Sequence, residues 1–268
     1  MKSSFDYESK PFGLGKITTA PWFIPALKLK YGLASIEGVR GKILEIGCGG
    51  GAMAKAIKRY RPDLQVYGGD ISRSTLALAK QNSNGVKFEY ADIYKLPYTK
   101  EEFGAILGFD VFEHFADLKK AISESKRVLK KGGIIHIAIP YEGSRWNIEG
   151  WLTLFGWRAK EIYCGHVKGL RIGQVEKEFE RNGFRLIDRR FSTHLLGQLA
   201  DALYFSLIYI RGKNFPYQVE GYVSQEKGAK PQIVKVLKNI FATVTYFESL
   251  AFFWFPGLTG HLTFKKIT

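Results

Sequence analysis

The sequence predicts an α/β protein with a mixed, mostly parallel sheet of seven strands and a helical insertion between the sixth and seventh strands. Short apolar runs alternate with amphipathic helical stretches from residue 42 to residue 191, the pattern of a sheet covered by helices. Some runs, such as residues 134–139, are apolar at nearly every position, as expected of strands buried on both faces. A glycine cluster at residues 47–51 joins the first strand to the first helix of the alternation.

The alternation can be followed element by element. Pro62 ends one helix because proline cannot continue it, and Gly183 ends another as a C-cap. The expected strands are 42–47, 64–69, 86–90, 103–109, 134–139, 184–191 and, at the C-terminus, 260–267. The expected helices of the core are 52–61, 73–81, 118–130 and 170–182.

These elements divide the chain into four parts. Residues 1–40 form an N-terminal helical cap with a short amphipathic helix within 21–31, and residues 41–194 form the core. Residues 195–258 form an apolar helical insertion, and residues 259–268 supply the final strand of the core sheet.

Composition restricts the environment and the partners. The net charge of +15 predicts attraction to polyanions, either nucleic acid or an anionic membrane surface. Two cysteines exclude a disulfide framework and favour a reducing compartment. The first residues lack the apolar region of a signal peptide. We therefore expect a cytoplasmic protein, peripheral on the inner face of the membrane.

The glycine cluster predicts a nucleoside-binding corner. Glycines allow positive φ and close approach of a ligand, and the helix that follows offers free N–H groups. Asp70 ends the next strand about 20 residues after the cluster, the spacing at which a carboxylate reaches ribose hydroxyls. A dinucleotide fingerprint places two residues between its second and third glycines, whereas one residue separates Gly49 from Gly51.

The arrangement Glu45-x-Gly47-x-Gly49-x-Gly51 resembles the class I S-adenosylmethionine-dependent methyltransferases, which have a Rossmann-like fold. The similarity covers about residues 40–140 and is greatest to the type 11 enzymes that methylate ubiquinone and menaquinone precursors. It implies S-adenosyl-L-methionine as the cofactor. The residues implied to bind it are Glu45, Gly47, Cys48, Gly49, Gly51, Asp70, Ile71, Asp92, Ile93 and Phe109.

Catalytic candidates follow from the same resemblance. His114 lies in a segment after the fourth strand that resembles the quinone methyltransferases, and His166 precedes the helix before the sixth strand. Either imidazole can serve as a general base near neutral pH, and either can instead cap a helix or bond a backbone carbonyl. Asp110, Glu113 and His114 have the spacing of a divalent-metal set. The shorter reach of Asp110 makes a site without metal the preferred interpretation.

The insertion, residues 195–258, indicates where the methyl acceptor is found. Its two apolar stretches are interrupted by Asp201 and Glu248, so we expect them to lie in a membrane interface rather than to span it. A lid over the sheet and a dimer surface are the alternatives. Four lysines could face anionic headgroups: Lys227, Lys230, Lys235 and Lys238.

These features predict methyl transfer to a small lipophilic acceptor at the membrane surface, such as a quinone precursor, a lipid headgroup or a polyprenyl-linked sugar. An RNA methyltransferase, motivated by the charge, is the first alternative. A non-catalytic, membrane-recruited binding module with the same fold is the second. The sequence leaves the methylated atom and the oligomeric state open.

Overall fold

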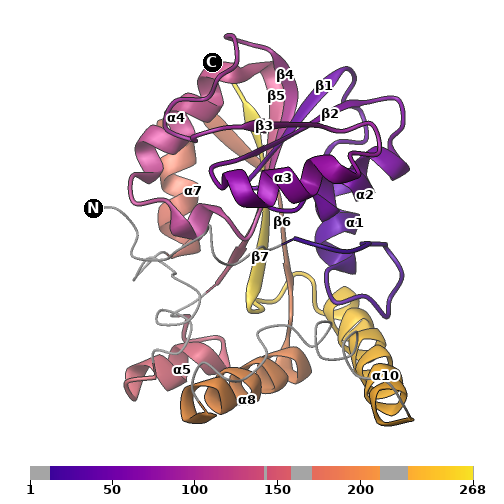
Figure 1. Cartoon of the computed structure of the whole chain (residues 1–268). Coiled ribbons are helices and arrows are strands. Elements are labelled where there is room, and N and C mark those ends of the chain that lie inside the picture. The colour runs from indigo at the N-terminus through magenta and orange to yellow at the C-terminus, as the bar shows by residue number, and fades with distance from the viewer. Residues whose placement is uncertain (1–12, 142–143, 158–170, 212–228, 268) are drawn as a thin grey trace.

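The computed structural model describes residues 13–141, 144–157, 171–211 and 229–267, and its centre is one sheet of seven strands (Figure 1). The spatial order is β3-β2-β1-β4-β5-β7-β6, and β7 is antiparallel to both of its neighbours. The strands are β1 Lys42–Ile46, β2 Gln65–Asp70, β3 Lys87–Tyr90, β4 Phe103–Phe109, β5 Leu129–Pro140, β6 Phe184–Ser192 and β7 Thr259–Lys266. The predicted mixed sheet, with its last strand supplied by the C-terminus, is therefore confirmed.

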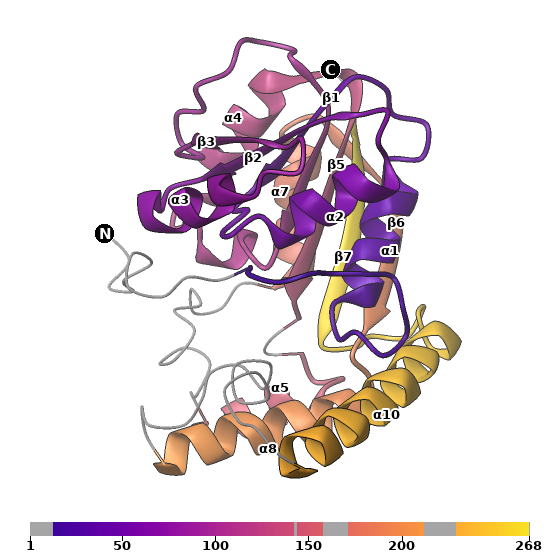
Figure 2. The same cartoon turned by 45° about the vertical axis from the view of Figure 1, so that its right-hand side comes forward.

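Helices cover both faces of the sheet (Figures 1 and 2). One face packs against α1 (Ala26–Ser35), α2 (Ala52–Tyr60) and α3 (Arg73–Gln81). The other face packs against α4 (Leu118–Val128) and α7 (Ile172–Arg181). Neighbouring strand residues such as Ile43 and Leu44 belong to opposite cores, because side chains alternate across a strand. This burial on both faces explains the continuous apolar runs in the sequence.

The predicted boundaries of α4, β5 and α1 were wrong. The helix expected to reach residue 130 ends at Val128, and β5 begins at Leu129 rather than at residue 134. The early start arises because Leu129 pairs with Phe103 of β4, ahead of a register shift. The N-terminal helix begins at Ala26, after Pro25, and continues to Ser35 instead of ending near residue 31.

A layer of helices lies beyond the carboxyl ends of β5 and β6 (Figure 2). It consists of α5 (Ile148–Leu154), α8 (Leu195–Arg211), α10 (Ala229–Ala251) and the turn at 252–255, and it is called the outer layer below. Its last helix packs on α1 through a small third core that includes Tyr31 and Tyr246. In the part of the chain that the structure describes, we find no helix long and apolar enough to cross a bilayer.

Candidate active site

The carboxyl ends of β1, β2 and β4 meet at one edge of the sheet, where the glycine loop (residues 47–51) leaves β1. The backbone N–H groups of Gly47 and Cys48 donate to the carbonyl oxygen of Gly69, at 2.8 and 3.1 Å. The loop is thereby fastened to β2 immediately before Asp70. Ligands of open parallel sheets bind beyond this edge, so the predicted cofactor residues of the first two strands lie together.

Gly47 and Gly51 adopt φ angles of +68° and +79°. A Cβ atom on Gly47 would lie 2.4 Å from the side chain of Val111, and one on Gly51 would lie 2.3 Å from the ring of Phe88. Both the backbone conformation and the close packing therefore demand glycine. Gly49 also has a positive φ, of +50°, which favours glycine at this position.

Asp70 is bonded to the loop through its side chain. Its Oδ2 accepts a hydrogen bond of 2.7 Å from the N–H of Gly49, and its Oδ1 accepts one of 2.9 Å from Ser72. Asp70 is half-buried, and its neighbour Ile71 is exposed. The pair presents a fixed carboxylate beside an apolar surface, which suits a ribose and its base.

Glu45 is buried beneath the glycine loop, on β1. It accepts a hydrogen bond from the backbone N–H of Ala54 in the first turn of α2, and its Oε2 has no hydrogen-bond partner. Burial raises the pKa of the Glu45 carboxyl well above its usual range, and the nearby charge of Asp70 adds to this. An unpartnered, buried carboxylate oxygen is costly, and a ligand with an ammonium or hydroxyl group would satisfy it.

Cys48 contributes its backbone rather than its thiol. The side chain is buried in the core shared with α2 and α3, and its Sγ lies 3.0 Å from where a Cβ on Gly68 would be. Burial, with Glu45 and Asp70 nearby, raises the pKa of the thiol well above its usual value. A thiol in that state is a poor nucleophile.

The remaining predicted cofactor residues lie after β3 and at the end of β4. Asp92 is half-buried, and its Oδ1 accepts a hydrogen bond of 2.9 Å from the N–H of Tyr94. Ile93 is buried. Phe109 ends β4, but a Cβ on Gly32 of α1 would lie 2.8 Å from its ring, so that ring packs against the N-terminal helix.

The segment after β4 lies directly against the glycine loop. Val111 packs on Gly47, and the 3₁₀ turn Phe112–His114 follows it. His114 is half-buried and Glu113 is buried. This contact places the segment that carries His114 against the glycine loop. His166, the second predicted base, lies outside the described residues.

The three residues with metal-ligand spacing, Asp110, Glu113 and His114, do not form a metal-binding cluster. Asp110, with φ of +52°, forms an ion pair with Lys28 of α1. Within the described ranges, no three His, Cys, Asp or Glu side chains lie close enough to hold a metal ion. The carboxylate of Asp110 pairs with the ammonium group of Lys28 instead. Through this ion pair the N-terminal cap contacts the segment after β4.

Sequence reasoning missed a second contribution of the N-terminal cap. The N–H of Ala52, at the start of α2, donates to the carbonyl oxygen of Gly13 at 3.0 Å, and a Cβ on Gly50 would lie 2.5 Å from the side chain of Leu14. Residues 13 and 14 therefore lie over the glycine loop. The available signal was Gly13 and Gly15 flanking one leucine, both with positive φ.

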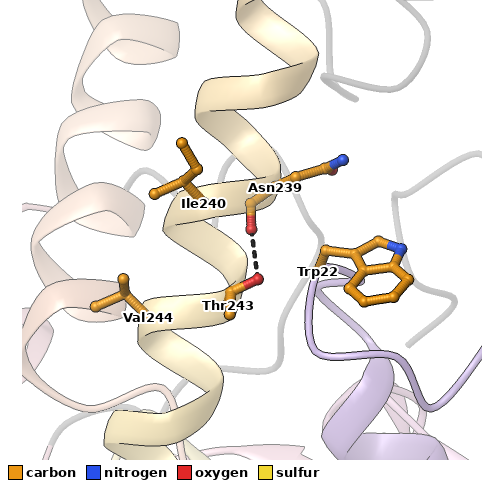
Figure 3. A pocket seen from close by; sticks show the side chains of 5 residues that line it. All are labelled: Trp22, Asn239, Ile240, Thr243 and Val244. Carbon is orange, nitrogen blue, oxygen red and sulfur yellow. Dashed lines mark hydrogen bonds between the residues drawn. The ribbon is translucent and has the colours of Figure 1, made fainter.

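An open hollow of about 360 Å³ lies away from the glycine loop, between α10 and the loop before α1 (Figure 3). Trp22, Ile240 and Val244 supply its apolar walls, and Thr243 bonds the backbone carbonyl of Asn239. No charged side chain lines it. Its chemistry is that of an apolar surface, not of a catalytic centre.

Comparison with known proteins shows what the core of the chain is similar to. The family model described as a methyltransferase domain matches residues 44–137, which include Glu45, the glycine loop, Asp70 and Asp92. Residues 44–137 are therefore similar to this methyltransferase domain. The matched range begins in β1 and ends in β5, so it contains the parallel strands that build the cofactor edge.

Relatives of this methyltransferase domain include enzymes of quinone biosynthesis. Demethylmenaquinone methyltransferase of Thermotoga maritima is 33% identical over 34% of this chain and 40% of its own length. Ubiquinone biosynthesis O-methyltransferase of Bartonella bacilliformis is 28% identical over 59% of this chain and 64% of its own. The chain thus matches less than two thirds of either relative.

Solved structures share the fold. A SAM-dependent methyltransferase from Archaeoglobus fulgidus superimposes with a TM-score of 0.56 at 15% identity, over 90% of this chain and 92% of that one. At this identity the likeness establishes the seven-stranded methyltransferase architecture.

Proposed function

We propose that this chain transfers a methyl group from S-adenosyl-L-methionine to a small lipophilic acceptor on the cytoplasmic face of a membrane. An isoprenoid quinone precursor is our first choice, and a lipid headgroup or a polyprenyl-linked sugar belongs to the same chemical class. The observation that carries the proposal is the glycine loop, held between the buried carboxylate of Glu45 and the fixed carboxylate of Asp70. The quinone-related names of the relatives support the choice of acceptor.

The residues of the site fit this cofactor. Glu45 has a free acceptor atom for the ammonium group of the methionine part, and Asp70 suits the ribose hydroxyls. Asp92 follows β3 at the same edge, and in this proposal its carboxylate accepts a hydrogen bond from the adenine amino group. When bound, the cofactor supplies a methyl group attached to a positively charged sulfur.

The protein's part in the reaction is to position the acceptor, exclude water and remove a proton. In-line transfer needs the acceptor atom aligned with the methyl carbon. Val111 sets the segment after β4 against the glycine loop, and His114 in that segment takes the acceptor proton in this proposal. Lys28 of α1 forms an ion pair with Asp110 and so connects the N-terminal cap to this segment. His166 remains the second candidate base.

A transfer assay with tritiated methyl groups tests the proposal. The label should enter the organic phase when membrane lipid extract is the acceptor, and should stay out of total RNA. Asp70→Asn should weaken cofactor binding about tenfold or more, because a charged acceptor is lost. Asp63→Asn, an exposed aspartate at the opposite end of β2, is the matched control and should bind normally.

Two outcomes contradict the proposal. Label in RNA would make the chain an RNA methyltransferase, as its net charge of +15 also suggests. Failure of the wild-type chain to bind the cofactor in calorimetry would leave a non-catalytic module with a methyltransferase fold.

A further inference from the structure

The side of α8 that faces away from the protein is a continuous apolar stripe. Leu196, Leu199, Leu203, Leu207 and Ile210 are all exposed, with 66% of Leu203 and 78% of Ile210 accessible. Their spacing of three and four residues places them on one face of the helix. A single exposed leucine is ordinary on a protein surface, but an unbroken helical face of them calls for a partner.

Polar side chains are buried on the protein-facing side of α8 and at one position of α10, although α10 also packs on α1 through the third core. Gln198 is 6% exposed, and its Oε1 accepts a hydrogen bond of 2.8 Å from the N–H of Ile148 in α5. Ser249 of α10 is buried, and its Oγ accepts one of 3.0 Å from Thr193. These bonds join α8 to α5 and the residue Thr193 to α10, and in α8 they leave Gln198 inward and the leucines outward. In water the hydrophobic effect favours the reverse arrangement.

The apolar face extends beyond α8. Val236, Ile240 and Val244 of α10 are exposed, and the last two line the hollow beside Trp22 (Figure 3). Exposed aromatic side chains lie at the other parts of the layer: Trp146, Trp151, Phe155, Phe252, Phe253 and Trp254. Tryptophan and phenylalanine on an otherwise aliphatic face are typical of helices that lie in a membrane interface.

The charge of the outer layer favours an anionic bilayer over a second copy of the chain as its partner. Among the described side chains of the outer layer and of residues 144–147, Arg145 and Lys235 are exposed, while no acidic side chain is. Glu149 is buried, and Asp201 and Glu248 are half-buried. Two copies of a chain with a net charge of +15 repel each other, whereas an anionic surface attracts this face.

We propose that the outer layer is a docking surface for an anionic lipid bilayer, with α8 lying in the plane of the interface. The layer sits beyond the carboxyl ends of the strands, on the side of the sheet where the glycine loop lies (Figure 2). Docking turns that edge toward the lipid. A consequence, which rests on the function proposed above, is that a lipophilic acceptor reaches the cofactor without crossing water.

Vesicle flotation of the full chain tests this. The wild type should float with vesicles of phosphatidylcholine containing about one third phosphatidylglycerol, and much less with phosphatidylcholine alone. Leu199→Glu with Leu203→Glu should lower the partition coefficient at least about tenfold, because two leucines no longer enter the interface. The matched control is Leu78→Glu with Ile187→Glu, two exposed apolar residues on α3 and β6, which should float like the wild type.

Folding and methyl transfer are measured separately from vesicle binding. All variants should keep the far-ultraviolet circular dichroism and the cofactor affinity of the wild type, so loss of flotation reports the surface alone. Flotation needs no methyl acceptor, and its result stands whether or not transfer is observed. The inference is overturned if the α8 double variant floats normally or if the wild type binds no vesicle. It is also overturned if the wild type sediments as a dimer that the α8 double variant dissociates.

Discussion

Helices α2 and α8 are both amphipathic, yet they are oriented in opposite ways. α2 buries Met53 and Ile57 against the sheet and leaves Arg59 in solvent. α8 buries Gln198 and exposes Leu199 and Leu203. The first arrangement is expected of a helix whose outer surroundings are water. The second leaves an apolar helical face exposed, and this difference is the observation behind the docking surface proposed above.

The largest effect is expected at the glycine loop, where the structure tolerates no added volume. Gly51→Val would place a branched side chain against Phe88 at a φ of +79°. It should lower the free energy of unfolding by about 3 kcal/mol or more and abolish cofactor binding. Thermal melting and calorimetric titration measure both effects. Gly173→Ala in α7, where a Cβ meets nothing within 4 Å, is the control and should melt like the wild type or slightly higher.

The next effect concerns two buried histidines between the sheet and α1. Burial, aided by the charge of Arg190, lowers the pKa of His136 to about 3. Burial, His136, Lys28 and Arg190 lower the pKa of His261 well below 6.5. The unfolded chain therefore binds more protons than the folded chain below about pH 6.5. Stability should fall as the pH drops from 6.5 toward 3, by about 1.4 kcal/mol per pH unit for each histidine.

Denaturant titrations at several pH values measure this slope. His136→Gln with His261→Gln removes the groups that titrate, so its free energy of unfolding should depend less on pH between 6.5 and the acid limit. An equally steep slope in the double variant would place the acid sensitivity elsewhere.

Two adjacent residues of α8, the buried Gln198 and the exposed Leu199, test the difference between α8 and α2 directly. Gln198→Leu leaves the N–H of Ile148 without its acceptor and should lower the free energy of unfolding in solution by about 1–3 kcal/mol. Leu199→Gln should leave stability within about 0.5 kcal/mol but weaken vesicle binding. If Leu199→Gln lowered the free energy of unfolding more than Gln198→Leu, the apolar face of α8 would be the one that stabilises the fold in water, as it is in α2.

The smallest effect should come from charge at the edge of the layer. Lys235→Glu on α10 should weaken binding to anionic vesicles about fivefold at low salt, and less at high salt. Lys80→Glu on α3 changes the net charge equally, and Lys80 is exposed as well. Equal losses in the two variants would mean that net charge, rather than the outer layer, controls binding.

The fold was predictable because its signals are local and repeated. Alternating apolar runs located all seven strands, and the C-terminal run 260–267 was correctly assigned as the last strand. The boundary between α4 and β5 was missed because Leu129 is held as a strand by Phe103, a partner 26 residues earlier in the chain.

The site was predictable to a smaller extent. Gly47, Gly49, Gly51 and Asp70 come together because adjacent parallel strands end at one edge. The contacts of Gly13 with α2 and of Lys28 with Asp110 join segments far apart in the chain. Neither contact leaves a periodic pattern in the sequence.

By itself the sequence determined where the seven strands and the glycine loop lie along the chain, since positive φ and strand periodicity are properties of short segments. Only the tertiary structure decided which side of each helix meets the protein. Helical periodicity marks an apolar face but does not say what covers it. In α2 the sheet covers that face, whereas in α8 the described residues leave it exposed and Gln198 is buried instead.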